Sequence, residues 1–411
     1  MSTAATSCRL RRVALLALVA PLAVVAACGT ADDVRTGGAP AGAPGVAAQP
    51  RLTPYPPQPA GVPYPDAEWP VGTLPPEVSL LALDAATEQA FEPSDSEQGV
   101  RSIVVIRGGQ LVYERYHPLD GPDERYSSFS VAKSFTSALV GLAVGDGLLT
   151  EGQTALRAEW QGAGDRRAGI ELRDLLQMSS GLEWDESYTA PSDVLTMITS
   201  ADAAAFVAAK PLESEPGTVY EYSTGTTALL VGIVADRLDG CAESTEYVNE
   251  RLLDPIGITT DELLLDDAGC WLGGLGANMT TRDFARFGLL YLRGGQWDGT
   301  QLLAESWVDA SRTPAPTNEG YGYQWWLNGD NDRFTARGLL GQLIVVVPSL
   351  DVTIAVNSAG GDPDGLVETV LAELRFPTGP DPAVTTTTTP PAPTTTTTGP
   401  VGSSGTLPAV L

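Results

Sequence analysis

Two low-complexity ends limit what this chain can fold into. Residues 29–74 are rich in Ala, Gly and Pro, and residues 377–411 contain two runs of five threonines separated by Pro and Ala. Segments of this composition bury too little apolar surface to offset the entropy lost on ordering. We therefore expect a flexible linker over residues 28–74, a folded domain over 75–376, and a disordered Thr/Pro-rich tail over 377–411.

The N-terminus has the features of an export signal. Arg9, Arg11 and Arg12 precede an apolar run over residues 13–27 that is too short to cross a bilayer comfortably. The run leads into Cys28-Gly29 through Val-Ala-Ala, a pattern that resembles a bacterial lipobox. We expect residues 1–27 to be a signal peptide and Cys28 to carry a lipid that anchors the linker at the extracytoplasmic face of the membrane. An ordinary signal peptide with a chance cysteine is the alternative.

Cys241 and Cys270 remain once Cys8 is removed with the signal and Cys28 is acylated. Outside the cytosol an even pair of cysteines often forms a disulfide. The sequence predicts that Cys241 and Cys270 are joined, and a buried pair of free thiols is the alternative.

The charge and the scarcity of certain residues exclude several classes of function. The chain has 51 Asp+Glu against 24 Lys+Arg, and its net charge of −27 repels phosphate backbones, so we expect no nucleic-acid partner. The only histidine, His117, rules out a His-rich zinc site, and we expect no metal and no cofactor. His117 follows the strand-like run 111–116 and is expected at the surface, where a strand ends.

The order of hydrophobic patterns predicts an α+β fold. Strand-like runs at 102–107 and 111–116 are joined through Gly108-Gly109, a hairpin signal. Helical patterns, such as 203–209, 226–238 and 284–292, dominate from about 150 to 312. Further strand-like runs follow at 323–327, 334–337, 343–347 and 352–356, before a closing helix over 365–374. We expect an antiparallel sheet flanked by helices and formed from both chain ends, with a mainly helical second lobe.

Ser130 and Lys133 are the residues best suited to chemistry. A helix is expected from about residue 130 to 144, and residues three apart on a helix share a face. A serine hydroxyl needs a base to act as a nucleophile at neutral pH, and burial favours the neutral, basic form of a lysine amine. The neighbours Val131, Phe135 and Leu139 make this helix apolar, where a stray lysine would be costly. A capping serine beside a surface lysine is the alternative.

The segment 128–137, which contains this pair, resembles the active-site helix of the serine β-lactamase and penicillin-binding-protein superfamily. It is most similar to the class C-like branch, which includes esterases, D-amino-acid peptidases and 6-aminohexanoate-dimer hydrolases. Segments 175–182, 216–223, 252–257, 273–276 and 282–288 match further motifs in the same order. The resemblance covers about residues 78–375 and implies a β-lactamase/transpeptidase-like fold.

The resemblance also implies roles for individual residues. Tyr222 is expected to hydrogen-bond Ser130 and Lys133 and to shuttle protons to the leaving group. The family's Tyr-x-Asn motif ends here in Thr224, which weakens any expectation of lactam side-chain recognition. The backbone amides of Ser130 and Gln342 are expected to form the oxyanion hole.

The third family motif departs from its usual pattern. Leu339 stands where the family has Lys or His, two residues before Gly341. Because that cation commonly binds a substrate carboxylate, penicillins and acyl-D-Ala-D-Ala peptides become less favoured substrates, unless Arg337 replaces it in part. We assign Leu339, Gly341, Trp184 and Trp325 to substrate binding. Packing in the core of a sheet is the alternative for Trp325.

The sequence thus predicts an exported serine hydrolase that cleaves a small ester, amide or peptide through a Ser130 acyl-enzyme. A β-lactamase or D-Ala-D-Ala-type cell-wall peptidase is one alternative. A non-catalytic surface protein that binds cell-wall fragments is another. The sequence leaves the substrate and the oligomeric state open.

Overall fold

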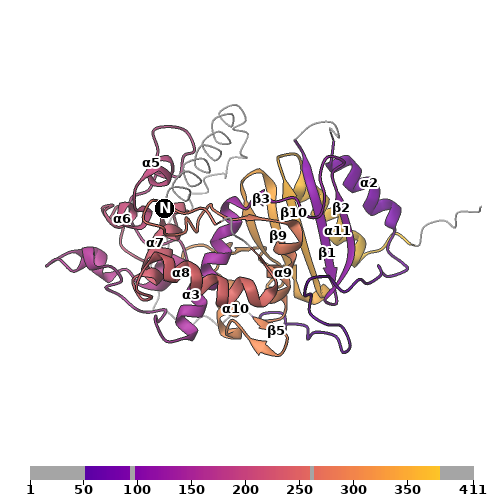
Figure 1. Cartoon of the computed structure of the whole chain (residues 1–411), viewed down its shortest axis with the longest axis horizontal. Helices are drawn as coiled ribbons and strands as arrows, with labels where there is room; N and C mark the ends of the chain where they lie inside the picture. Colours follow the sequence, from indigo (N-terminus) through magenta and orange to yellow (C-terminus); the bar gives the residue numbers. More distant parts are fainter. Residues whose placement is uncertain (1–50, 93–97, 260–262, 380–411) are drawn as a thin grey trace, which may run out of the picture.

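In the computed structural model, which describes residues 51–92, 98–259 and 263–379, a six-stranded antiparallel sheet joins the two ends of the folded chain (Figure 1). The strand order is β2-β1-β10-β9-β8-β7, so the N-terminal hairpin lies directly against the last strand. This confirms the predicted sheet built from both chain ends. Its strands are β1 (Val100–Arg107), β2 (Gln110–Tyr116), β7 (Trp326–Leu327), β8 (Phe334–Gly338), β9 (Gln342–Val347) and β10 (Val352–Ser358).

Helices cover both faces of the sheet, and β9 and β10 are therefore buried along their whole length. On one face α2 (Leu80–Ala90) and α11 (Pro363–Arg375) pack against side chains such as Ile103 and Ile354. On the other face, α9 (Thr281–Leu292) and α3 (Ala132–Gly145) bury Phe287 and Phe135, whose rings stack 3.7 Å apart. A capping box formed by Thr280 and Asp283 starts α9.

A mainly helical lobe lies beside the sheet (Figure 1). At its centre α7 (Thr224–Ala235) is buried on all sides and packs against α3 and α6. In the part of the chain that the structure describes, no helix is both long and apolar enough to cross a membrane. The other elements are β3 (Tyr126–Ser127), η2 (Phe129–Val131), η3 (Ala158–Trp160), η4 (Arg166–Gly169), α4 (Leu172–Leu176), α5 (Asp193–Thr199), α6 (Ala203–Ala208), α8 (Cys241–Val248), η5 (Asn249–Leu253), η6 (Asp254–Ile256), β4 (Asn278–Met279), β5 (Gln296–Trp297), β6 (Thr300–Gln301), α10 (Glu305–Ser311), η7 (Leu339–Gly341) and η8 (Pro348–Leu350).

The prediction of a flexible linker is wrong for residues 51–74. The Tyr55 hydroxyl donates to the Asp309 carboxylate at 2.8 Å, and the Arg312 guanidinium lies 4.1 Å from the centre of the Tyr55 ring. Trp69 is buried, and Gly72 N–H bonds the Leu111 carbonyl at 2.9 Å. The aromatic side chains among the prolines therefore supply apolar surface that this segment can bury. The average composition of the segment does not indicate this. Residues 28–50 of the predicted linker, Cys28 included, lie outside the described residues.

The expected surface position of His117 is also wrong. His117 does follow β2, but its side chain is fully buried. Its Nδ1 accepts a hydrogen bond from Leu119 N–H at 3.2 Å, and its ring meets that of Phe91 edge-on at 5.8 Å. The chain turns inward after the strand, which the pattern of the strand itself does not indicate.

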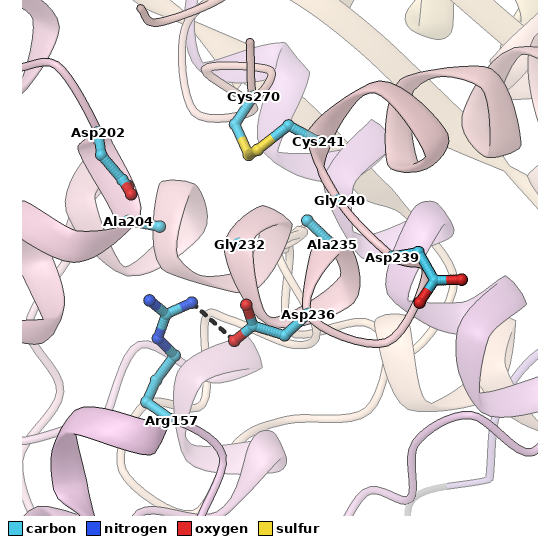
Figure 2. Close-up of a pocket in the computed structure, with 10 residues that line it drawn as sticks. All are labelled: Arg157, Asp202, Ala204, Gly232, Ala235, Asp236, Asp239, Gly240, Cys241 and Cys270. Carbon is cyan, nitrogen blue, oxygen red and sulfur yellow. Dashed lines mark hydrogen bonds and ion pairs between the residues drawn. A yellow bond between two sulfur atoms is a disulfide. The ribbon is translucent and has the colours of Figure 1, made fainter. Parts of the chain in front are cut away.

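A cavity of about 310 Å³ lies within the helical lobe (Figure 2). The Arg157 guanidinium bonds the Asp236 carboxylate at 2.8 Å across it, and Cys241 and Cys270 form part of its wall. Ser130 and Lys133 are not among its lining residues, so this cavity is separate from the candidate catalytic pair.

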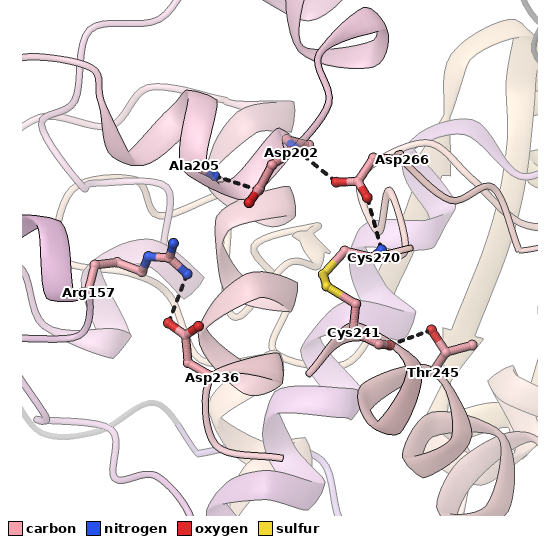
Figure 3. Close-up of a disulfide and its surroundings, with 9 residues drawn as sticks. Arg157, Asp202, Ala205, Asp236, Cys241, Thr245, Asp266 and Cys270 are labelled. Carbon is pink, nitrogen blue, oxygen red and sulfur yellow. Dashed lines mark hydrogen bonds and ion pairs between the residues drawn. A yellow bond between two sulfur atoms is a disulfide. The ribbon is translucent and has the colours of Figure 1, made fainter. Parts of the chain in front are cut away.

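A disulfide joins Cys241, the first residue of α8, to Cys270 (Figure 3). This is the pair expected from the sequence. Asp266 accepts hydrogen bonds from Cys270 N–H and from Ala203 N–H, both at 2.9 Å. The loop that carries Cys270 is thereby fixed to both α8 and α6.

Replacing both cysteines by serine should lower the free energy of unfolding by about 3 kcal/mol, because the bond closes a loop between residues 29 positions apart. Urea denaturation of the wild type, with and without reductant, and of the Cys241→Ser/Cys270→Ser variant measures this difference. Reductant should shift the wild type toward the variant and leave the variant unchanged. Coinciding denaturation curves for all samples would contradict the prediction.

Candidate active site

Ser130 lies in the short 3₁₀ turn η2, immediately before α3. The sequence predicted it in the first turn of one continuous helix, so the element is tighter than expected. Phe129, just before it, has a φ of 45°, a left-handed conformation that is costly for an aromatic residue. A Cβ on Gly338 would lie 2.5 Å from the Ser128 carbonyl oxygen. The end of β8 therefore approaches the Ser130 turn at backbone distance, which only glycine permits.

The Lys133 amine is buried and directed at Ser130. Its side chain is 1% exposed, and its Nζ lies 3.0 Å from Ser130 Oγ. The same Nζ donates to Thr224 Oγ1 at 2.9 Å and to the Gly274 carbonyl at 3.0 Å. Three acceptors from three separate segments therefore satisfy the three N–H groups of the ammonium. The alternative of a surface lysine beside a capping serine is excluded by this burial.

Burial lowers the pKa of Lys133 to about 8, against the opposing effect of the Glu186 charge. An amine with such a pKa is present in both protonation states near neutral pH. General acid–base groups are most effective when their pKa lies close to the working pH. Lys133 is thus suited to accept the Ser130 proton and to return it.

Tyr222 lies on the other side of the Lys133 amine, but its contact differs from the expected one. The Lys133 Nζ lies 4.8 Å from the centre of the Tyr222 ring, a cation–π arrangement in place of the expected hydrogen bond. Burial raises the pKa of the Tyr222 hydroxyl well above its usual value, and a hydrogen bond with Ser130 opposes that rise. Tyr222 is therefore protonated at neutral pH and can donate toward Ser130 or a leaving group.

Thr224 connects Lys133 to a carboxylate that the sequence analysis did not assign. Its hydroxyl accepts from Lys133 and donates to Glu186 Oε1, while its backbone N–H donates to Glu186 Oε2 at 2.8 Å. An asparagine amide at this position, as in the family motif, has separate donor and acceptor atoms, whereas the threonine hydroxyl performs both roles with one oxygen. The substitution thereby creates the chain Lys133–Thr224–Glu186.

Two aromatic side chains of the same segment donate hydrogen bonds to the Glu186 carboxylate. The Trp184 indole N–H donates to Glu186 at 2.6 Å, and the Tyr188 hydroxyl donates to it at 3.0 Å. Ser130 opposes the rise that burial causes in the pKa of the Tyr188 hydroxyl, so Tyr188 lies near Ser130 as well. Residues 184, 186 and 188 alternate along the chain, but no local sequence pattern indicates that Glu186 contacts Thr224 of α7. Trp184, expected to bind substrate, is buried behind the site and positions Glu186.

The turn between β8 and β9 presents the third-motif residues. The Gln342 side chain bonds both the N–H and the C=O of Ser358, so only its backbone amide can face a substrate. Gly341 has a φ of 94°, and a Cβ there would lie 2.3 Å from Pro363. Leu339, on the same turn, is half-buried. η2 packs against both β8 and β9, which brings this turn to Ser130.

Trp325 does not line the site, and the alternative of core packing is correct for this residue. It is fully buried, with its ring centre 4.6 Å from that of Tyr291 and 5.1 Å from that of Phe334. Its half-buried neighbour Trp326 faces the other way, 5.6 Å from the Tyr222 ring. The prediction for Trp325 is therefore wrong, because adjacent side chains on an extended chain point to opposite faces.

The charges around the site are unfavourable to an anionic ligand. Arg337, the candidate replacement for the family's cation, makes hydrogen bonds of 2.6–2.9 Å to Asp364 of α11. Burial raises the pKa of Glu221, beside Tyr222, and the charges of Glu213, Glu183 and Glu186 raise it further. A substrate carboxylate would meet these carboxylates, and Arg337 is held by Asp364.

Comparison with known proteins identifies the family of this chain. Residues 87–374 match the family described as Beta-lactamase, which covers more than half of the chain. The chain belongs to the beta-lactamase family. The resemblance and the fold class inferred from the sequence are thus confirmed, and so is the prediction that this family member is an enzyme, a hydrolase.

Several individual proteins show moderate similarity to this chain. The 6-aminohexanoate-dimer hydrolase of Paenarthrobacter ureafaciens is 26% identical over 317 residues, which are 70% of this chain and 80% of that protein. The crystal structure of a family VIII carboxylesterase matches with a TM-score of 0.58 and 15% identity, over 73% of this chain and 98% of that one. The octameric penicillin-binding protein homologue of Pyrococcus abyssi matches with a TM-score of 0.55 and 18% identity, over 71% and 76%. The two structures establish the fold alone.

Replacing Glu186 by Gln should move the acidic limb of the kcat/KM profile to lower pH. The working form of a lysine base is the neutral amine, so activity rises as the pH passes the Lys133 pKa of about 8. The Glu186 charge raises that pKa, and its removal therefore lowers it. The measurement is ester hydrolysis by the Glu186→Gln variant between pH 5 and 10.

The matched control for this shift is Glu183→Gln, which removes the same charge from an exposed side chain on the same segment. Its acidic limb should remain close to that of the wild type. An unchanged limb in Glu186→Gln, or equal shifts in both variants, would show that Glu186 does not act on Lys133.

Proposed function

We propose that this protein is a serine hydrolase that cleaves small esters or amides through a Ser130 acyl-enzyme. The observation that carries the proposal is the contact of 3.0 Å between the buried Lys133 Nζ and Ser130 Oγ. A hydroxyl beside an amine that is readily neutral is an activated nucleophile. No cofactor takes part in the mechanism.

The acylation half of the reaction begins when Ser130 Oγ attacks the substrate carbonyl carbon and its proton passes to Lys133 Nζ. The backbone amides of Ser130 and Gln342 stabilise the resulting oxyanion, as the family pattern implies. Tyr222, protonated at neutral pH, gives its proton to the leaving alcohol or amine and is reprotonated from Lys133. The carbonyl carbon is then bonded to Ser130 as an ester.

In the deacylation half, water attacks the carbonyl carbon of the acyl-enzyme and gives a proton to Lys133, which is neutral again after it has reprotonated Tyr222. Collapse of the second tetrahedral intermediate breaks the bond to Ser130 Oγ, which regains its proton. The carboxylic acid leaves and the enzyme returns to its initial state.

Uncharged acyl and leaving groups fit the site best. Leu339 replaces the family's cation, Arg337 is paired with Asp364, and Glu221 and Glu186 add negative charge. The amide hydrolysis named for the Paenarthrobacter relative is compatible with such a site. A β-lactamase or D-Ala-D-Ala-type peptidase is the second candidate, favoured by the family assignment but opposed by these charges. A non-catalytic wall-binding protein would have no use for a buried lysine at the nucleophile.

We further propose that the protein is exported and anchored through a lipid on Cys28. The proposal rests on the lipobox-like sequence at Cys28 and is supported by the disulfide between Cys241 and Cys270, a bond typical of oxidising compartments. Cys28→Ser should move the protein from the membrane fraction to the soluble fraction of a bacterial host that lipidates exported proteins. Equal distribution of variant and wild type would contradict the anchor.

Ser130→Ala should abolish covalent labelling by a fluorophosphonate and lower p-nitrophenyl butyrate hydrolysis by at least about a thousandfold, because the nucleophile is lost. Ser137→Ala, on the same helix, is the matched control and should retain both.

The wild type should hydrolyse p-nitrophenyl butyrate, a neutral ester, with a higher kcat/KM than nitrocefin, which carries a carboxylate. Undiminished turnover by Ser130→Ala would end this mechanism, and faster nitrocefin turnover would favour the β-lactamase.

A further inference from the structure

The chain contains two lysines, and the second one, Lys210, is also held in a fixed contact. Lys210 follows α6 and forms an ion pair with Asp193, the first residue of α5, with side-chain exposures of 16% and 17%. Its Nζ also lies 5.2 Å from the centre of the Phe206 ring. Screening by solvent is weak for such a pair, so it can fix the geometry of the segments that it joins.

The second carboxylate oxygen of Asp193 accepts a hydrogen bond from Asp185 N–H at 3.0 Å. The backbone around Lys210 approaches the same segment, because Glu183 N–H bonds the Pro211 carbonyl at 2.9 Å. The ion pair thus connects the end of α6, the start of α5 and the residue that immediately precedes Glu186.

Glu186 depends on this segment for its position. Its carboxylate must reach both the hydroxyl and the N–H of Thr224, which belong to α7 in a different part of the chain. Tyr188, two residues further on, donates to Glu186 at 3.0 Å and so depends on the same segment. Small displacements of a catalytic group can cost about a hundredfold in rate, so the anchoring of this segment matters for the reaction.

Building on the proposed hydrolase function, we infer that Lys210 and Asp193 are positioning residues that hold the segment 185–188 in place, so that Glu186 acts on Lys133 through Thr224. Lys210 touches neither Ser130 nor Lys133 in the described contacts. The titratable side chains that lie near Lys133, directly or through Thr224 and Ser130, are those of Glu186, Tyr188 and Tyr222. Lys210 reaches this set only by way of Asp193 and the backbone of Asp185.

The variant Lys210→Gln tests this role, and the fold should tolerate it. Arg167 Nη1 donates to the Lys210 carbonyl at 3.0 Å and to the Ala208 carbonyl at 2.9 Å, so the backbone at this point has an anchor that the substitution leaves intact. Lys210→Arg keeps the charge and serves as the conservative rescue. Arg251→Gln breaks an ion pair with Asp146 elsewhere in the helical lobe and is the matched control. Thermal unfolding of each variant shows whether the fold persists.

The experiment measures the second-order rate constant of fluorophosphonate labelling at Ser130 as a function of pH. Lys210→Gln should slow labelling about tenfold on the plateau well above the Lys133 pKa of about 8, where the amine is neutral in every variant. It should also move the acidic limb of the profile in the same direction as Glu186→Gln, to lower pH, because the Glu186 charge is then less well placed to raise the Lys133 pKa. Lys210→Arg should restore most of the rate, and Arg251→Gln should match the wild type.

A double-mutant cycle separates positioning from general stabilisation. If Lys210 acts through Glu186, then Lys210→Gln should have little further effect on a Glu186→Gln protein. An equal effect of Lys210→Gln in both backgrounds, or no effect in either, would overturn the inference. A wild type that is not labelled at Ser130 would instead overturn the proposed function itself, so the two failures are distinguishable.

Discussion

The burial of one amine organises the candidate active site. The Lys133 ammonium is out of water and would be unstable without replacement partners, since a desolvated charge is costly unless it is hydrogen-bonded. Ser130, Thr224 and the Gly274 carbonyl supply those partners from three segments, which lie up to 141 positions from Lys133 in the sequence. The same burial brings the pKa of Lys133 to about 8. The Lys133 Nζ therefore both connects three segments of the fold and has a pKa close to neutral pH.

The arrangement explains why the site tolerates departures from the family pattern. Thr224, in place of asparagine, still accepts from Lys133 and adds a link to Glu186. Leu339, in place of a cation, leaves the pairing of Gln342 with Gly338 at the start of β9 intact. Under the proposed function, these departures change which substrates fit beside Ser130, whereas the contact of Ser130 with Lys133 is kept.

Much of the fold was predictable because it depends on local patterns. The glycine-linked hairpin β1–β2, the strand-like runs of β9 and β10 and the closing helix α11 are signals contained within a few residues. Local patterns did not indicate the burial of residues 51–74 or of His117. In both cases burial depends on surfaces supplied by distant segments, such as the side chains of Asp309 and Arg312 that receive Tyr55.

For the site, the sequence by itself determined the pair Ser130 and Lys133, because a spacing of three residues sets their proximity once a helix forms. It could not decide that Trp326 rather than Trp325 faces Tyr222, since strand register decides which neighbour points inward. Nor could it assign Glu186 to the Lys133 network. That contact exists only because separate segments fold against α7, and a relation between distant segments has no local signature in the sequence.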